Sequence, residues 1–130
     1  MNPLGGLAFV AIGVGAALGA WLRYLLSLWL NPLAPTLPLG TVAANLGGGF
    51  MIGAAVAFLG AQEGISPAWR LFLVTGFLGG LTTFSTFSAE SMLLLQQGRS
   101  GAALLHAAVH LFGALACCFV GYELARRVLV

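Results

Sequence analysis

The sequence contains neither lysine nor aspartate, and its few charges come from five arginines and three glutamates. Charged residues make up only 6% of the chain, whereas an ordinary soluble domain has roughly 25%. A soluble fold with so few charged side chains could not cover its own surface. The formal net charge of +2 includes no cluster of basic residues, which excludes nucleic acid as a partner.

Cysteine is scarce as well, and the two cysteines, Cys117 and Cys118, are adjacent in an apolar run. Adjacent cysteines have poor geometry for a disulfide, and their spacing resembles no zinc site. We expect both to act as small packing residues. The sequence also shows no nucleophile–base pair and no soluble domain that would hold a catalytic site, so we do not expect an enzyme.

Hydrophobic residues make up 60% of the chain, and its mean hydropathy is +1.03. A helix needs about 20 apolar residues to cross the hydrocarbon core of a membrane. Four segments reach that length and are separated by short stretches of proline, glycine and polar residues: about 7–30, 39–61, 68–97 and 102–125. They predict an all-α, multi-pass membrane protein with a single four-helix transmembrane domain. We expect it in the lipid bilayer of the cell membrane (the inner or plasma membrane).

Small and polar residues recur at a spacing of four in the predicted helices, which puts them on one face of each helix. The first helix carries Gly15, Gly19 and Arg23, and the second carries Asn45 and Gly49. Glycines on such a face let helices approach closely in lipid. Packing does not explain Arg23 or Asn45. For Arg23 two roles remain open: its side chain snorkels to the nearer interface, or it draws anions inward.

The third predicted helix contains a stretch that forms helix poorly near the middle of the membrane. Its two adjacent glycines are followed by the hydroxyl residues Thr82, Thr83, Ser85, Thr86, Ser88 and Ser91. Non-helical backbone at membrane depth survives only where it is buried in protein or lines a cavity. Broken helices also coordinate ions through freed carbonyl groups. We therefore predict that the third helix is broken near its middle and holds an ion or small-solute site, with a structural kink as the alternative.

The side chains available in the predicted helices favour an anion. Acidic side chains, which line many cation pathways, are nearly absent from these segments. The available donors are Arg23, the amide of Asn45 and the hydroxyls of the third helix. Phe84, Phe87 and Ser88 share one helical face, and a phenyl ring presents a positive edge to an anion. The residue chemistry by itself therefore predicts a route for a small anion.

Glu90, His106 and His110 are titratable residues within the predicted helices. We expect Glu90 to pair with backbone or with an arginine near one membrane face, with proton transfer as the alternative. His106 and His110 have the spacing of a metal site on a helix, yet two histidines alone make a weak one. We expect these two side chains to form hydrogen bonds within the bundle.

Three segments resemble the motifs of the Fluc (CrcB) family of fluoride channels. Residues 76–90, with the sequence GFLGGLTTFSTFSAE, resemble the third-helix signature of this family, and residues 13–24 and 38–50 resemble its first- and second-helix motifs. The resemblance covers the whole chain and implies a fluoride-selective passive channel that exports fluoride from the cytoplasm and protects against its toxicity. It also implies an antiparallel, dual-topology homodimer with a structural sodium ion (Na+) at its centre.

The resemblance further implies roles for individual residues. Those implied to line the fluoride pathway are Asn45, Phe84, Phe87, Thr41, Ser88 and Arg23, the last of them in a vestibule. The backbone carbonyl groups of Gly79 and Thr82 are implied to hold the sodium ion. His106 and His110 stand where many relatives have a tyrosine and a serine. This difference raises the hypothesis of pH-dependent conduction, because histidine titrates near neutrality.

The distribution of arginines agrees with insertion in both orientations. With four spans, both termini and the second loop share a side, which carries Arg70, Arg126 and Arg127. The other side has Arg99, with Arg23 near its interface. An unequal number of arginines and lysines on the two sides of the membrane orients a membrane protein. Three arginines against two is a small difference, so insertion in either orientation is expected.

Two other functions remain open on the residues alone. A small four-helix multidrug exporter needs a membrane-embedded acid in its first helix, and the first predicted helix here contains none. A non-conducting structural membrane subunit would use the small-residue faces only for packing. In that case polar substitutions in the third helix would affect assembly but no flux.

Overall fold

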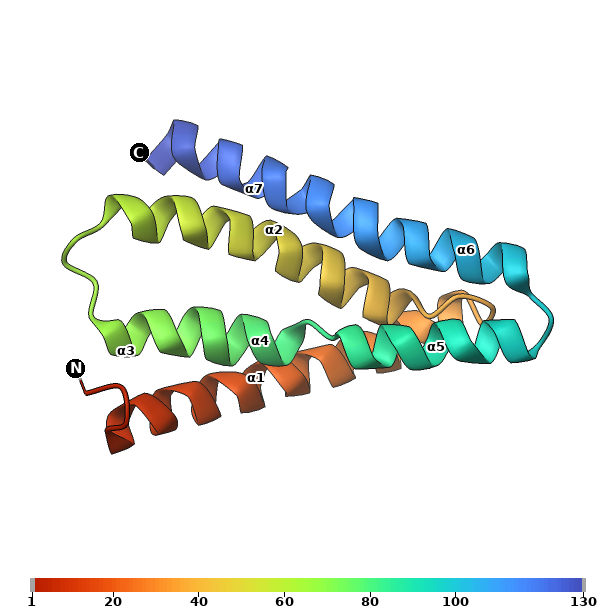
Figure 1. The fold of residues 1–130 in the computed structure, drawn as a ribbon, viewed down its shortest axis with the longest axis horizontal. Helices are drawn as coiled ribbons and strands as arrows, with labels where there is room; N and C mark the ends of the chain where they lie inside the picture. Colours follow the sequence, from red (N-terminus) through yellow and green to blue (C-terminus); the bar gives the residue numbers. More distant parts are fainter. Residues whose placement is uncertain (1, 130) are drawn as a thin grey trace.

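The structure is a computed structural model that describes residues 2–129, which fold into four long helical spans with consecutive spans antiparallel (Figure 1). The α-helices are α1 (Gly6–Leu30), α2 (Leu39–Ala61), α3 (Pro67–Arg70), α4 (Gly79–Leu81), α5 (Phe84–Gln96), α6 (Ser100–Ala108) and α7 (Ala114–Leu129). The other helical segments are the 3₁₀ helix η1 (Asn31–Leu33) and the π-helical η2 (Leu71–Leu78) and η3 (Val109–Gly113). Residues 2–129 contain no strand.

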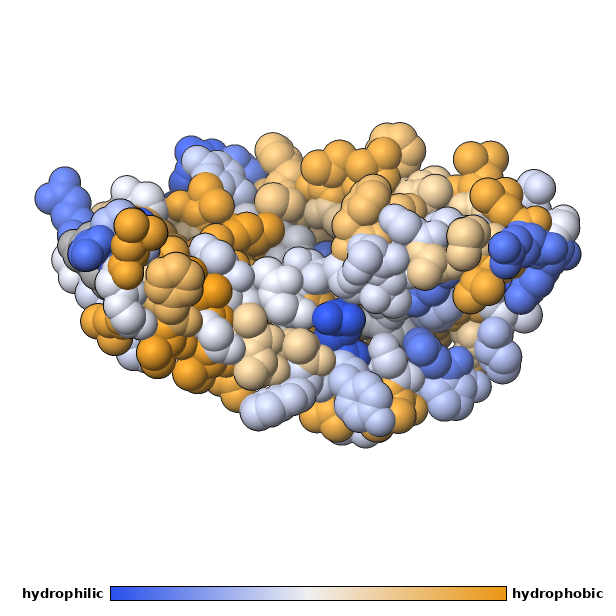
Figure 2. Space-filling view, turned by 60° about the horizontal axis from the view of Figure 1, so that its bottom comes forward, coloured by the Kyte–Doolittle hydropathy of each residue, from blue (hydrophilic) through white to orange (hydrophobic). Residues whose placement is uncertain are grey.

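Four helical runs are long and apolar enough to cross a membrane, and we call them the first to fourth spans: Gly6–Leu33, Leu39–Ala61, Pro67–Gln96 and Ser100–Leu129. Large apolar side chains stay exposed along them, among them Phe9, Trp21, Leu104, Phe112 and Phe119. In Figure 2, hydrophilic residues lie at the two ends of the molecule and also near its middle, between hydrophobic residues. Helices with satisfied backbone groups and apolar exteriors are what a bilayer accepts. The chain is therefore a multi-pass membrane protein, and the prediction of four apolar helices is confirmed.

Polar contacts hold the ends of the spans. Asn31 follows α1, and its Oδ1 atom accepts a hydrogen bond of 2.8 Å from the Gly40 amide at the start of α2. Arg99 donates a hydrogen bond of 3.3 Å to the Thr36 carbonyl oxygen, which joins the loop before the fourth span to the loop after the first. Both termini lie at the opposite end of the bundle (Figure 1).

Glycines allow the spans to approach one another closely. A Cβ atom on Gly19 of α1 would overlap the Phe77 carbonyl oxygen in η2, and one on Gly53 of α2 would overlap the Cys118 carbonyl oxygen in α7. Small residues permit such approach in lipid, where apolar surface gives no drive to associate. A core of buried apolar residues lies within the bundle: Ala44, Ala55, Leu59, Leu78 and Leu81.

The third span changes conformation near its middle. Helix α4 ends at Leu81 and α5 begins at Phe84, and the residues between them, Thr82 and Thr83, have extended backbone with ψ angles of 150° and 122°. Thr83 then caps α5, because its hydroxyl accepts a hydrogen bond of 3.1 Å from the Thr86 amide. Backbone N–H and C=O groups that would pair with each other in a continuous helix are therefore available to other partners.

The fourth span contains a π-helical turn, η3, which includes His110. Such turns inside α-helices often occur at functional sites, because the inserted residue changes the direction of nearby side chains. Segment η3 packs against α2. The turn therefore places His110 beside the second span, next to the polar residues described below.

Candidate functional site

A groove of about 470 Å³ opens between the second, third and fourth spans. Its wall includes five of the residues predicted from the sequence: Asn45, Gly79, Thr82, Phe84 and Phe87. Two further polar residues, Thr83 and His110, also line it. The described residues that form this wall include no acidic side chain. The groove therefore combines an apolar wall with a few convergent polar groups, as small-ligand sites usually do.

The amide of Asn45 is held by the backbone of Thr83, at the non-helical part of the third span. Asn45 Oδ1 accepts a hydrogen bond of 2.7 Å from the Thr83 amide, and Asn45 Nδ2 donates one of 2.9 Å to the Thr83 carbonyl oxygen. Buried backbone groups must be paired, and here one side chain satisfies both. This double contact determines which atom of the amide is oxygen and which is nitrogen.

The orientation of Asn45 decides how His110 is protonated. Asn45 Nδ2 also lies 3.0 Å from His110 Nδ1. Because Nδ2 is a donor, His110 Nδ1 accepts this hydrogen bond, and a neutral imidazole then carries its proton on Nε2. His110 Nε2 is buried and has no hydrogen-bond partner among the described residues. The expected hydrogen bonding of the histidines within the bundle is therefore confirmed for His110, which also presents an N–H group that remains free.

Two phenylalanine rings stand beside this amide. The centroids of Phe84 and Phe87 are 5.4 Å apart, with an angle of 63° between the ring planes. Phe84 is 80% exposed, so its ring lies on the open side of the groove. Phe87 is partly buried, with its ring centroid 4.7 Å from that of His110. The edges of such rings are positively polarised and attract an anion.

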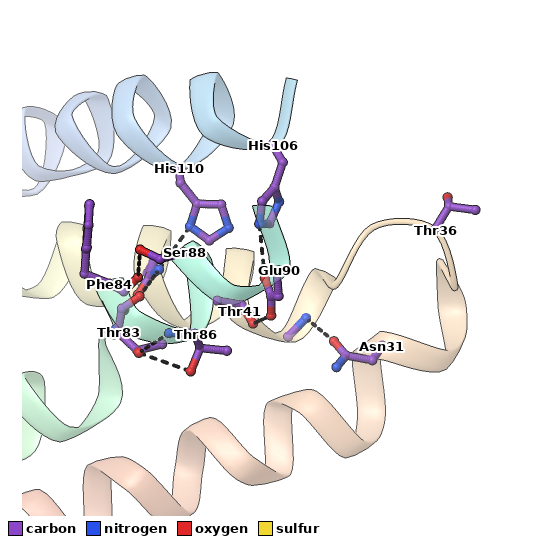
Figure 3. Close-up of polar contacts among 12 residues, drawn as sticks. Asn31, Thr36, Thr41, Thr83, Phe84, Thr86, Ser88, Glu90, His106 and His110 are labelled. Carbon is purple, nitrogen blue, oxygen red and sulfur yellow. Dashed lines mark hydrogen bonds and ion pairs between the residues drawn. The ribbon is translucent and has the colours of Figure 1, made fainter. Parts of the chain in front are cut away.

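Thr41, Glu90 and His106 form a second polar group that joins three spans (Figure 3). Thr41 Oγ1 donates a hydrogen bond to Glu90 Oε1, and Glu90 Oε2 lies 3.1 Å from His106 Nε2. Thr41 and His106 are only 2% and 0% exposed. The expectation that Glu90 pairs with backbone or with an arginine is wrong. The rotation of α5 turns this carboxylate toward the second and fourth spans instead.

Three of the predicted pathway residues lie outside the groove wall. Thr41 bonds Glu90, and Ser88 Oγ donates a hydrogen bond of 2.8 Å to the Phe84 carbonyl oxygen of its own helix. Arg23 Nε donates a hydrogen bond of 3.2 Å to the carbonyl oxygen of Gly80 in α4. Carbonyl groups in the last turn of a helix lack intrahelical partners. Arg23 therefore satisfies this helix end, a role that neither of the two sequence alternatives included.

The backbone carbonyl groups of Gly79 and Thr82 lose the partners that a continuous helix would give them. In an α-helix each carbonyl accepts from the amide four residues later. In a continuous helix the Thr83 amide would donate to the Gly79 carbonyl oxygen, but here it donates to Asn45 Oδ1. The Thr86 amide would likewise donate to the Thr82 carbonyl oxygen, but it donates to the Thr83 hydroxyl. Freed carbonyl oxygens of this kind are able to coordinate a cation.

Two parts of the site were not found from the sequence. Thr83 orients Asn45 through its backbone, a role that no pattern of side chains signals. The contact between Glu90 and His106 joins the third span to the fourth. Its only sequence signal was the presence of ionisable residues in apolar segments, which are usually functional.

The chain matches the family described as CrcB-like protein, Camphor Resistance (CrcB), over residues 10–122. It is similar to a protein of Aromatoleum aromaticum named Fluoride-specific ion channel FluC, with 57% identity over 115 residues that cover 88% of each chain. Proteins of the same name from Cupriavidus pinatubonensis and Chromohalobacter salexigens are 56% and 58% identical. The first of these matches covers 93% of this chain and 94% of the relative, and the second covers 88% and 87%.

Proposed function

The chain belongs to the CrcB-like protein family, and from this premise we propose that it is a passive, fluoride-selective ion channel of the cell membrane. Its relatives are named for that activity, and the family is one of ion channels rather than enzymes. One observation in the structure carries the proposal: Asn45, Phe84 and Phe87 meet in a groove whose described wall has no acidic side chain. In a cell with a negative interior, passive flow expels fluoride and so protects against its toxicity.

Asn45 is proposed as the central donor of the pathway. Fluoride holds its water tightly, so a pore must replace that water with densely placed donors. One N–H of Asn45 bonds the Thr83 carbonyl oxygen and the other bonds His110 Nδ1. An arriving anion competes for the second N–H, exchanging one hydrogen bond for another. The free Nε2–H of His110 and the edges of the neighbouring phenyl rings are further donors to the same ion.

The hydroxyls of Thr41 and Ser88 are proposed to continue the route beyond the groove. Their present partners, Glu90 and the Phe84 carbonyl oxygen, are acceptors, and a hydroxyl rotates readily from one acceptor to another. Arg23 contributes positive charge near the middle of the third span, where it bonds Gly80. A narrow route of this composition disfavours larger anions such as chloride.

Phe84→Ile tests the role of the ring edge. We expect wild-type protein in liposomes to release fluoride, and the variant to release it about tenfold more slowly or slower still. A tenfold decrease corresponds to an increase of about 1.4 kcal/mol in the free-energy barrier to passage. Isoleucine fills much of the same volume but has no positively polarised edge. A fluoride electrode measures the efflux, and the same liposomes loaded with chloride give the selectivity.

The matched control is Phe119→Ile. Phe119 lies on α7, is 67% exposed and does not line the groove, so this variant should conduct like wild type. If monodisperse wild-type protein released no fluoride, or released chloride as fast as fluoride, the proposal of a fluoride-selective channel would be wrong. A non-conducting structural subunit would then be the better account.

We propose further that two copies pair as an antiparallel homodimer with dual topology. The groove is open on one side, where Phe84 is 80% exposed, and the hydroxyl residues Ser85 and Ser88 are exposed near the middle of the span. Lipid is a poor environment for polar groups at that depth, and a second copy would cover them. The near-even distribution of arginines between the two sides supports insertion in both orientations.

A structural sodium ion is proposed at the centre of this dimer, bound by the carbonyl oxygens of Gly79 and Thr82. The two residues fit such an ion, because the amides that would satisfy these carbonyls in a continuous helix donate elsewhere. The break in the third span would then serve this cation as well as the anion pathway. When bound, the ion supplies positive charge that satisfies the freed carbonyl groups and stabilises the assembly.

Both features are testable on one protein. With Cys117 and Cys118 replaced by alanine, Glu63→Cys places a single thiol in the exposed loop after α2. We expect a membrane-impermeant maleimide to label it from both faces of the membrane in similar amounts, whereas labelling from one face would exclude dual topology. We also expect a lower melting temperature in N-methylglucamine chloride than in sodium chloride. Equal melting temperatures would exclude a structural sodium ion.

A further inference from the structure

Glu90, His106 and His110 converge beside the groove, whose wall includes only the last of them, and we call them the Glu–His–His cluster. One potential ligand atom from each side chain lies within 4.8 Å of the other two. His106 and His110 extend from the fourth span toward the third, where Glu90 lies (Figure 3). The two imidazole rings have centroids 4.4 Å apart. The sequence showed only the histidine pair, and the fold adds the third ligand from 16 residues earlier in the chain.

The cluster contains polar atoms that the fold leaves without hydrogen bonds. Glu90 Oε2, both ring nitrogens of His106 and His110 Nε2 are buried and have no hydrogen-bond partner among the described residues. Glu90 Oε2 and His106 Nε2 contact each other at 3.1 Å, whereas His106 Nδ1 and His110 Nε2 have no such contact among the described residues. Each buried, unsatisfied polar group costs about 1–3 kcal/mol. A single cation between these atoms would satisfy one atom of each side chain at once.

Two imidazoles and one carboxylate are the donor set of a transition-metal site. Zinc sites with two histidines and one glutamate keep a fourth position open for water or another ligand. With zinc–ligand bonds of about 2.0–2.2 Å, tetrahedral ligand atoms are about 3.3 Å apart. The separation of 3.1 Å between Glu90 Oε2 and His106 Nε2 already matches this value. A ligand atom of His110 lies within 4.8 Å of those of the other two side chains, so His110 has to approach them to complete the site.

The surroundings of the cluster orient its ligands. Thr41 Oγ1 donates to Glu90 Oε1, which leaves Oε2 directed at the histidines, and hydrogen bonds of this kind raise metal affinity in known sites. His110 lies in the π-helical turn η3 and also lines the groove. The cluster therefore borders the groove through His110.

We propose that the Glu–His–His cluster binds one divalent transition-metal ion, with Zn²⁺ as the ion to test first, through Glu90 Oε2, His106 Nε2 and His110 Nε2. Nitrogen ligands favour zinc, copper and nickel over magnesium and calcium. In the protein without metal, His110 Nδ1 accepts a hydrogen bond from Asn45 Nδ2. Metal binding at Nε2 moves the ring proton to Nδ1, which then no longer accepts this hydrogen bond. The bound metal therefore breaks the contact between His110 and Asn45.

Loss of the contact between His110 and Asn45 predicts that Zn²⁺ inhibits fluoride efflux. This consequence rests on the proposed channel function. The Asn45 amide stays bound to Thr83 by its other two hydrogen bonds, but it loses the histidine that aligns its second N–H. The divalent charge beside the route would also hold an anion too tightly to leave. Binding and inhibition are separate measurements, so each is testable without the other.

Isothermal titration calorimetry of ZnCl₂ into the full-length protein, purified with EDTA and then freed of it, measures the binding. We expect one site per chain in the wild type. His106→Gln, His110→Gln and Glu90→Gln should each weaken binding at least about tenfold, since even outer-shell changes cost 10–100-fold. Glu63→Gln, the same change in an exposed loop, and the Cys117→Ala/Cys118→Ala variant should bind like wild type.

No binding by wild type, or binding that survives all three cluster substitutions, would overturn the proposal. So would binding that disappears only when the cysteines are replaced. If a cluster variant fails to fold, Co²⁺ added to the wild-type protein gives an independent answer. Nitrogen and oxygen ligands in a tetrahedral site produce visible absorption without the thiolate charge-transfer band that cysteine ligands would add, and a thiolate band would overturn the proposal.

Fluoride efflux from liposomes, measured with and without Zn²⁺ and after EDTA, tests the consequence for conduction. Inhibition that EDTA reverses and that His106→Gln abolishes supports it. Unchanged efflux in the presence of bound Zn²⁺ would overturn the link to the pathway. Absence of efflux before any metal is added would count against the channel function, and the calorimetric result would still decide the metal site.

Discussion

Asn45→Asp is expected to slow fluoride efflux by about a thousandfold. The substitution replaces a donor NH₂ with a carboxylate oxygen at the point where Asn45 Nδ2 bonds the Thr83 carbonyl oxygen and His110 Nδ1. A carboxylate about 4 Å from fluoride repels it by about 4 kcal/mol at an effective dielectric constant of 20. Each 1.36 kcal/mol added to a barrier slows the passage tenfold, and the lost donor adds to this effect.

The measurement is fluoride-electrode efflux from liposomes that contain equal amounts of monodisperse protein. The matched control is Asn31→Asp, because the Asn31 Oδ1 atom only accepts a hydrogen bond from the Gly40 amide at the start of α2. A carboxylate keeps that contact and suits the N-terminus of a helix. If the Asn45→Asp variant released fluoride as fast as wild type, Asn45 would not be part of the fluoride pathway.

Gly53→Ala is expected to prevent the protein from folding into a stable bundle. The new Cβ atom would overlap the Cys118 carbonyl oxygen and approach the Tyr122 amide, both backbone groups of α7. No side-chain rotation relieves that overlap, so the second and fourth spans must separate. Overpacking a tight core costs about 1–3 kcal/mol even where side chains adjust, and we expect about 3 kcal/mol or more here.

Gly47→Ala on the same helix is the control. Apart from its chain neighbours and the backbone of its own helix, no atom of the described residues lies within 4 Å of a Cβ at Gly47. Alanine stabilises a helix by about 1 kcal/mol relative to glycine. Thermal unfolding in detergent and elution from a size-exclusion column measure both variants. A Gly53→Ala protein as stable and monodisperse as wild type would show that the second and fourth spans do not pack in the arrangement described.

The predictions that depended on local properties agree with the structure. Four apolar segments long enough to cross a bilayer are visible in the sequence, and four such helices are present in the described residues. This agreement has a simple cause, because lipid leaves the backbone no partner but itself and so selects helices wherever apolar runs are long enough. The polar groups of the groove were also identifiable, since ionisable and amide side chains in apolar segments rarely lack a role.

The predictions that depended on contacts between spans were less complete. Glu90 was expected to pair with backbone or an arginine, but it contacts Thr41 and His106. Arg23 satisfies the carbonyl group of Gly80, a partner 57 residues away. The spacing of residues along one helix defines its faces, but it does not tell which neighbouring helix each face meets.

The sequence by itself determined that this protein lies in a membrane, that its backbone is helical, and that the groups available inside it are amide, hydroxyl, phenyl and imidazole. Only the tertiary structure decided how they combine. Asn45 is oriented by the backbone of Thr83, 38 residues later, and this contact in turn determines which nitrogen of His110 carries the proton. Such contacts depend on the rotation and depth of each helix against its neighbours. Close packing between small residues sets that arrangement, and no property of a single helix specifies it.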